Sequence, residues 1–142
     1  MSYYMCPCCY KVYDGHFLKS DEYYGMRCPD MDCASMDIEL FEIDELMVIP
    51  IRKLNALGYI TKYCCSGHTW DNGCAGGYIM FEVNEWFPMV PSAPKGWYLD
   101  GDCIRFKMKY DLTPSKKRFL INKSINELIK WCDTLPAVEY DE

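Results

Sequence analysis

The sequence lacks any long hydrophobic run. None of its apolar stretches approaches the roughly 18 to 20 uninterrupted residues that a membrane-spanning helix needs. The first residues, MSYYMCPCC, also lack the basic and then apolar build of a signal peptide. We therefore expect a cytoplasmic protein with no membrane partner. Internal repeats and low-complexity segments are absent as well.

Basic side chains are scarce in the first third of the chain. Residues 1–45 carry three basic and ten acidic side chains, and the whole chain of 142 residues has a formal charge of −6. This balance argues against the uniformly basic surface of a nucleic-acid-binding protein, so nucleic acid is not an expected partner. Residues 103–130, in contrast, carry eight basic and two acidic side chains. Any anion-binding surface is therefore expected in the C-terminal half.

Cysteine is abundant, with ten residues in the chain. Because a cytosolic protein keeps its thiols reduced, metal binding explains the clustered cysteines better than disulfides do. Two close pairs, in C-P-C-C and C-P-D-M-D-C, are separated by 18 residues. This spacing predicts a tetrahedral structural Zn²⁺ site in a zinc ribbon over residues 1–43. The predicted ligands are Cys6, Cys9, Cys28 and Cys33, with Cys8 as an alternative to its neighbour Cys9.

The predicted zinc site would have a folding role. About forty residues with so few aliphatic side chains could hardly hold together without metal. A closed four-cysteine site leaves no coordination position open for chemistry. The acidic residues around the cysteines would repel phosphate, so we expect the ribbon to contact protein or to serve structure alone.

Residues 44–136 are expected to form a second, α+β domain of two layers, with an antiparallel or mixed sheet and two main helices. The first helix should run from Asp44, its N-cap, to Leu57, with Gly58 as the stop, and Pro50 should kink it or move its start later. Hydrophobic patterning predicts strands over 59–65, 77–84 and 103–110. A closing helix begins at Thr113, and residues 137–142 form a flexible tail.

The strand over 103–110 alternates cleanly between apolar and basic residues. Arg105, Lys107 and Lys109 fall on one face, opposite a hydrophobic face. A solvated surface and a binding surface both fit such a basic face. Residues 86–102 contain three spaced prolines and several aromatics, which predicts a long ordered loop or a flap that covers a ligand.

The stretch YCCSGHTWDNGCAGGY connects the first two predicted strands and admits four interpretations. A second zinc could use Cys64 or Cys65, His68 and Cys74, with Cys103 or Cys132 as a distant fourth ligand. A Cys65 nucleophile could be activated by His68. The loop could be a plain glycine-rich connection. The fourth interpretation is an anion cradle with contributions from the basic strand. Its residues are Ser66, Gly67, His68, Trp70, Gly76, Gly77, Arg105, Lys107 and Lys109.

The run PIRKLNALGYITKYCCSGH followed by GGYIMFE resembles a group of small uncharacterised proteins of Gram-positive bacteria and their phages. A looser similarity is to the wybutosine-synthesis methyltransferase family, whose strand ends in T-x-S-S-C-S-G-R. Thr61, Cys65, Ser66 and Gly67 match that pattern, and His68 stands at the position of the arginine. The match therefore transfers no methyltransferase activity.

Taken together, these patterns favour a non-catalytic zinc-binding protein that binds a small anionic ligand. The phage resemblance implies a protein that sequesters a nucleotide signal of host defence, in the cytoplasm of a bacterial host. One alternative is a zinc-ribbon module that regulates a host protein, and another is a transferase- or hydrolase-like enzyme that uses Cys65 and His68. An oligomer is compatible with each of these functions.

Overall fold

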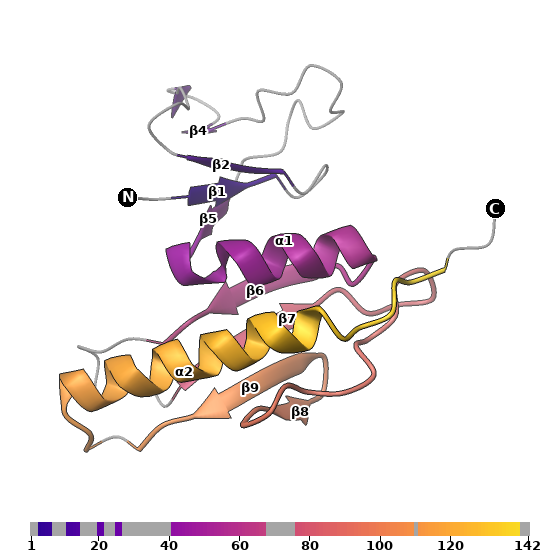
Figure 1. The fold of residues 1–142 in the computed structure, drawn as a ribbon. Coiled ribbons are helices and arrows are strands. Elements are labelled where there is room, and N and C mark those ends of the chain that lie inside the picture. The colour runs from indigo at the N-terminus through magenta and orange to yellow at the C-terminus, as the bar shows by residue number, and fades with distance from the viewer. Residues whose placement is uncertain are drawn as a thin grey trace. The chain divides into compact units, whose positions relative to one another are not determined.

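The computed structural model describes residues 3–6, 11–14, 20–21, 25–26, 41–67, 76–109 and 111–139. The chain divides into two compact units, Met1–Val48 and Ile49–Glu142. Its fold is α+β, as the sequence predicts, with helices and antiparallel sheets (Figure 1). The predicted zinc ribbon falls largely outside the described residues.

The N-terminal unit contains an antiparallel sheet built around its first strand. β1 (Tyr3–Met5) pairs with β2 (Val12–Asp14) on one side and with β5 (Phe41–Ile43) on the other. Separately, β3 (Ser20–Asp21) pairs with β4 (Gly25–Met26). Met5 and Ile43 are buried, so the described strands of this sheet contribute to a core.

The C-terminal unit is a four-stranded antiparallel sheet with α1 (Val48–Leu57) and α2 (Pro114–Cys132) on one of its faces (Figure 1). In spatial order the strands are β6 (Thr61–Cys65), β7 (Gly76–Phe81), β9 (Cys103–Lys107) and β8 (Tyr98–Asp100). β7 and β9 are thus central, and β6 and β8 are the edges. Neither helix has both the length and the hydropathy to cross a membrane, and no other candidate occurs among the described residues.

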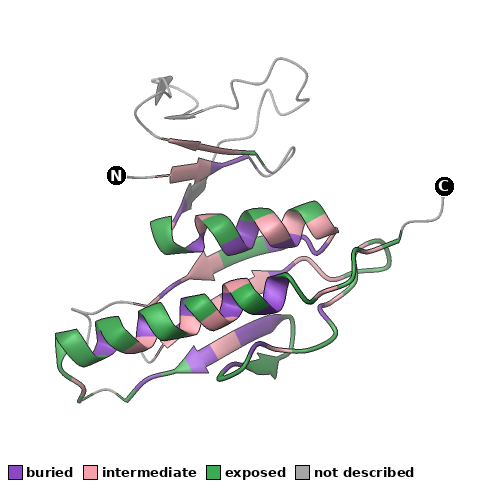
Figure 2. Cartoon of the chain, viewed as in Figure 1, coloured by how far each residue is buried: buried purple, intermediate pink, exposed green. Residues whose placement is uncertain are grey.

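The core of this unit lies between the sheet and the helices. Alternate residues of the two central strands are buried, namely Ile79, Phe81, Ile104 and Phe106. Helix α2 supplies buried residues about once per turn, which Figure 2 shows as purple segments along its length; they include Ile121, Ile125 and Leu128. Both helices lie on one side of the sheet, and the described residues of this unit place no helix on the other face. That face carries the candidate site.

The start of α1 follows from its proline. Asp44 caps a short 3₁₀ helix, Glu45–Met47, through a hydrogen bond from the Leu46 N–H to Oδ1 (3.2 Å), and α-helix begins only at Val48. Pro50 therefore lies in the first turn of α1, where a missing N–H costs no intrahelical hydrogen bond. The sequence predicted that Pro50 would either kink the helix or move its start later, and the structure has the later start.

A closed network of hydrogen bonds joins the end of α1 to the start of β6. Gly58 has φ = 99°, and the N–H of Tyr59 donates to the carbonyl of Leu54 (3.0 Å), which together form a Schellman C-cap. The Asn55 side chain donates to the Ile51 carbonyl (2.8 Å) and to the Thr61 hydroxyl (2.9 Å). Its Oδ1 accepts from the Thr61 N–H (3.1 Å). The L-N-x-x-G-Y-x-T motif is therefore a clamp between α1 and β6.

Replacing Asn55 with alanine is expected to destabilise the C-terminal unit by about 2 kcal/mol, because partly buried groups of Thr61 and Ile51 lose their partner. Urea unfolding followed by tryptophan fluorescence measures the change. Asn122→Ala, at an exposed position of α2, is the control and should shift the free energy of unfolding by less than about 0.5 kcal/mol. Equal effects of the two substitutions would contradict a clamping role for Asn55.

The proline-rich segment after β7 is anchored to α2 and includes an edge strand. The indole N–H of Trp97 donates to the Ser124 carbonyl (3.0 Å), and the Trp97 ring meets Phe106 edge-on with centroids 4.7 Å apart. The Trp131 indole N–H donates to the Ser92 hydroxyl (3.0 Å). Trp97 therefore belongs to the core. β8 lies in this segment, where the sequence predicted a loop or flap.

The segment that follows α2 returns to the end of α1. The Tyr59 hydroxyl donates to the Pro136 carbonyl (3.0 Å), and the N–H of Val138 donates to the Leu57 carbonyl (2.7 Å). At least Val138, within the stretch predicted as a flexible tail, thus makes a backbone hydrogen bond with the helix.

Candidate functional site

The helix-free face of the sheet carries aromatic and basic side chains in a fixed register. Directly paired residues of antiparallel strands share a face, so the pairings Cys65–Tyr78, Tyr78–Arg105 and Arg105–Tyr98 form one row across all four strands. A neighbouring row consists of Tyr63, Met80, Cys103 and Asp100. Lys107 extends the set, because it lies two residues beyond Arg105 on β9.

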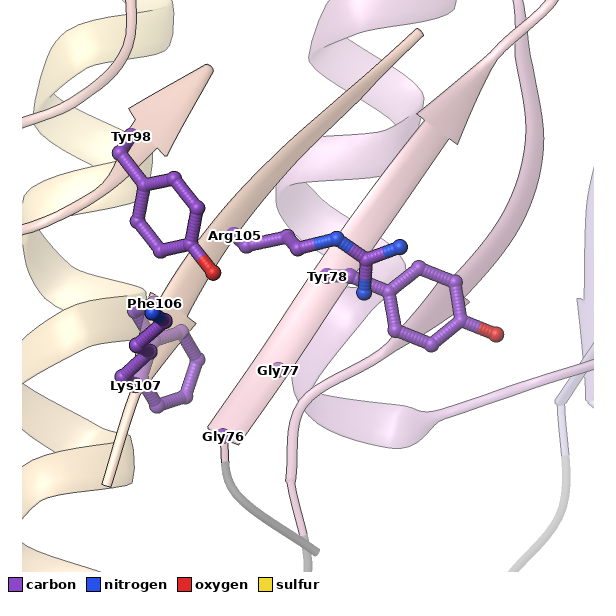
Figure 3. Close-up of a pocket in the computed structure, with 7 residues that line it drawn as sticks. All are labelled: Gly76, Gly77, Tyr78, Tyr98, Arg105, Phe106 and Lys107. Atoms are coloured by element: carbon purple, nitrogen blue, oxygen red, sulfur yellow. The ribbon is translucent and has the colours of Figure 1, made fainter. Parts of the chain in front are cut away.

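A pocket of about 170 Å³ lies on this face over β9. It is lined by Gly76, Gly77, Tyr78, Tyr98, Arg105, Phe106 and Lys107. Figure 3 shows Arg105 reaching from β9 towards the ring of Tyr78, with Tyr98 on the other side of β9. This volume is below the roughly 300 Å³ at which pockets for drug-sized ligands begin. The pocket could therefore hold one end of a ligand rather than enclose it.

The two cations of the pocket, Arg105 and Lys107, contact side chains of the neighbouring strands β7 and β8. The Nε of Arg105 donates to Oδ2 of Asp100 (2.8 Å), and its guanidinium carbon lies 5.2 Å from the centroid of the Tyr78 ring. The Nζ of Lys107 lies 5.2 Å from the centroid of the Tyr98 ring. Among the described residues no carboxylate pairs with Lys107. The pocket thus presents one paired and one unpaired cation, each beside an aromatic ring.

Burial raises the pKa of the Tyr78 phenol, and the nearby Cys65 and Cys64 thiols raise it further, whereas Arg105 opposes the shift. The phenol is therefore neutral at physiological pH, and it leaves the positive charge of the pocket intact. Its ring is an apolar wall with a hydrogen-bonding tip.

The two glycines at the start of β7 are required by the approach of the neighbouring strands. Gly76 has φ = 138°, and a Cβ there would overlap the carbonyl of Phe106 on β9. A Cβ at Gly77 would lie 2.5 Å from the Cys65 carbonyl oxygen and 2.5 Å from the Phe106 ring. Their role in sheet packing is thus independent of any ligand. As a consequence, the backbone at this corner of the pocket has no side chain over it.

The structure brings together four of the nine residues predicted for an anion cradle: Gly76, Gly77, Arg105 and Lys107. Ser66 is buried. A Cβ at Gly67, which has φ = 97°, would lie 3.3 Å from Ile121 on α2 and 3.4 Å from the Gly76 carbonyl oxygen, so Gly67 lies against the helix. Lys109 is exposed beyond the end of β9. His68 and Trp70, as well as Cys74, lie outside the described residues.

The other basic residues of 103–130 do not join this pocket. Lys117 is fully buried on α2, one turn before Ile121, so it contributes nothing to a solvent-exposed positive surface. Lys116, Arg118, Lys123 and Lys130 are exposed on the same helix, which covers the opposite face of the sheet. Positive charge on the helix-free face of β9 therefore comes from Arg105 and Lys107.

Cys103 and Cys132 lie far from Cys65, so neither is placed to complete a second zinc site with it. Cys103 is two strands away, or about 10 Å across the sheet. Cys132 lies about 16 Å along α2 from Ile121, which contacts the Gly67 position. Burial raises the pKa of the Cys103 thiol, although Arg105 acts to lower it. Burial also raises the pKa of the Cys132 thiol, to about 12. Both are neutral thiols at physiological pH and poor nucleophiles.

Of the predicted zinc ligands, the structure describes Cys6, while Cys9, Cys28 and Cys33, like Cys8, lie outside the described residues. Cys6 is buried directly after β1, and its N–H donates to the Lys11 carbonyl (3.0 Å) just before β2. This hydrogen bond continues the pairing of β1 with β2 by one step beyond Met5 and Val12. With three ligands outside, no group of three metal-ligating side chains occurs in the described part of the chain.

Sequence reasoning missed Tyr78, Tyr98 and Asp100. All three belong to the pocket or fix its arginine through cross-strand neighbours, and their positions depend on β8. The Gly101–Asp102 dipeptide, with Gly101 at φ = 59°, was the available signal, because Gly-Asp as a two-residue connection is typical of a hairpin turn. No protein-family model, no curated protein and no solved structure matches this chain.

Proposed function

We propose that the protein binds a small anionic ligand, with phosphate as the recognised group, at the pocket on the helix-free face of the sheet. The observation that carries this proposal is the placement of Arg105 and Lys107 on one side of β9, beside the side-chain-free corner at Gly76. Two cations facing the same small volume favour an anion there.

The orientation of Arg105 supports phosphate recognition. Asp100 engages its Nε and the Tyr78 ring lies beside its guanidinium, so the side chain has lost much of its freedom before a ligand arrives. A prearranged guanidinium loses less entropy on binding and can offer two parallel N–H groups to an oxyanion. Lys107 adds a point charge without an acidic partner among the described residues.

The tyrosines favour a ligand that also carries a planar ring. Tyr98 is 37% exposed, so part of its ring remains available for stacking. A nucleotide combines a phosphate for the two cations with a base for the ring. Binding of a nucleotide without turnover is the property that sequestration of a nucleotide signal would need.

Converting both cations to glutamine, in Arg105→Gln/Lys107→Gln, is expected to weaken binding of a mononucleotide such as AMP by at least about 30-fold, since two charge-assisted contacts are lost. Isothermal titration calorimetry at low salt measures the dissociation constant. Lys62→Gln is the matched control, because Lys62 lies on the edge strand β6 and pairs with Glu82 (3.1 Å) away from the pocket. It should leave the affinity within about twofold.

Two results would contradict this proposal. One is the absence of binding by AMP, inorganic phosphate and pyrophosphate to the wild-type protein. The other is an equal loss in the double variant and in Lys62→Gln. Recovery of the nucleotide unchanged after incubation tests whether the protein only binds it.

We also propose that the N-terminal unit holds one structural Zn²⁺ through Cys6, Cys9, Cys28 and Cys33. The buried position of Cys6 directly after β1 supports this assignment. When bound, the metal would cross-link segments of the unit and supply no reactive position.

A further inference from the structure

The helix-free face extends well beyond the pocket and carries a third tyrosine at its far edge. Tyr63 on β6 pairs with Met80 on β7, which places it on the same face as Tyr78. Its side chain is 62% exposed and does not line the pocket. Three strand spacings, or about 14 Å, separate the strands of Tyr63 and Tyr98. One mononucleotide cannot cover both.

We propose that this face binds single-stranded nucleic acid, with its bases stacked on Tyr98, Arg105 and Tyr63 and its phosphates against Arg105 and Lys107. This inference rests on the proposed anion site and names the class of its ligand as an oligonucleotide. The pocket is too small to enclose a whole nucleotide, so the remainder of any such ligand must lie on the open face.

The arrangement of rings and cations matches the chemistry of an unpaired strand. Tyr98, Arg105 and Tyr78 follow one another across adjacent strands, so a guanidinium plane lies between two aromatic side chains (Figure 3). Unpaired bases stack on aromatic rings and on guanidinium planes, and cations between the rings track the phosphates. A protein partner with an apolar surface would use only Tyr63 on this face. The cations on β9 require an anionic partner.

The C-terminal unit is close to neutral, so its net charge does not repel a nucleic acid. The acidic excess of the chain lies in residues 1–48, while residues 49–142 carry twelve basic and eleven acidic side chains. With about two phosphates contacted, the logarithm of the binding constant should fall with a slope of about −1.4 against the logarithm of salt concentration. Raising NaCl from about 50 to about 200 mM should therefore weaken binding only about sevenfold.

The test compares UMP with oligouridylates of two, four and eight nucleotides, titrated into the zinc-loaded full chain. We expect U8 to bind at least about tenfold more tightly than UMP, since each further stacked base adds affinity. Most of the gain should be reached by U4. If U8 binds no more tightly than UMP while UMP binds, the oligonucleotide assignment is overturned and the proposed anion site stands. If neither binds, both fail.

Substitution of Tyr63 distinguishes binding across the helix-free face from binding in the pocket alone. Tyr63→Ala should weaken U8 binding by about tenfold and leave UMP binding unchanged, because one stacking ring is lost outside the pocket. Phe119→Ala is the control, an aromatic that is 67% exposed on α2, and it should affect neither ligand. Equal effects of the two substitutions on U8 would overturn the assignment.

Two competitors test the partner class. The self-complementary octamer GCGCGCGC forms a stable duplex that hides its bases, so it should bind more weakly than U8. A hexaglutamate peptide tests whether the face recognises charge without bases, and it should fail to displace U8 at equal concentration. Displacement by the peptide would overturn the assignment in favour of an acidic protein segment.

Discussion

Cys6→Ser is expected to abolish stoichiometric zinc binding and to unfold residues 1–48. The serine hydroxyl is a poor ligand, and the apparent free energy of binding of a structural zinc, about 10–16 kcal/mol in small zinc domains, is also their folding free energy. Cys6 is buried directly after β1 and its N–H donates to the Lys11 carbonyl, so the loss should extend to the pairing of β1 with β2 and β5. Elemental analysis measures the metal, and ¹H–¹⁵N correlation spectra report the unfolding.

The control for this prediction is Cys64→Ser, at a half-buried position of β6 that belongs to neither cysteine pair. It should retain one zinc per chain. The fold of residues 49–142 should be retained in Cys6→Ser, because these residues form a compact unit of their own. Full zinc content in Cys6→Ser would contradict the ligand assignment. A wild-type content of two ions per chain would point instead to a second site that includes His68.

Gly76→Ala is expected to destabilise the C-terminal unit by at least about 3 kcal/mol, which is enough to unfold many small domains. The added methyl group would overlap the Phe106 carbonyl, and φ = 138° is a conformation that L-residues rarely adopt. Because the clash is with backbone of the adjacent strand β9, a rotamer change cannot relieve it. Urea unfolding followed by the fluorescence of the buried Trp97 and Trp131 measures the loss.

Gly101→Ala provides the matched control. Gly101 also has a positive φ, of 59°, but a Cβ there meets nothing within 4 Å. Its substitution should cost only about 1 kcal/mol, the conformational penalty alone. The difference between the two variants therefore isolates the close approach of β7 and β9. A loss in Gly76→Ala as small as that in Gly101→Ala would contradict this approach.

The side of β9 that bears the cations was predictable from the sequence. Strict alternation placed Arg105 and Lys107 on one face, and antiparallel pairing on both sides of β9 maintains that division. The tyrosines beside them were not predictable in the same way. Their alignment depends on the register of β7 and β8 against β9, and that register follows from close backbone contacts at Gly76 and from the turn at Gly101.

β8 and Lys117 show why local patterns fail for parts of this chain. All three residues of β8 are exposed, so no alternation marks the strand, and it exists because β9 offers a free edge. Lys117 shares the buried stripe of Ile121 and Ile125 at helical spacing. A charged residue in a core stripe is normally read as solvent-facing, since lysine is almost never fully buried. Tertiary packing decided both cases.

The hydrogen bonds that join the end of α1 to the segment after α2 have a consequence for folding. Leu57 and Tyr59, near the beginning of the C-terminal unit, are bonded to Val138 and Pro136, near its end. Contacts of such large sequence separation raise the contact order and slow folding, because a long loop must close before they form. During synthesis, these contacts cannot form until residues 136–138 have emerged from the ribosome. The end of α1 therefore waits for residues made after the sheet and α2 before it gains these two hydrogen bonds.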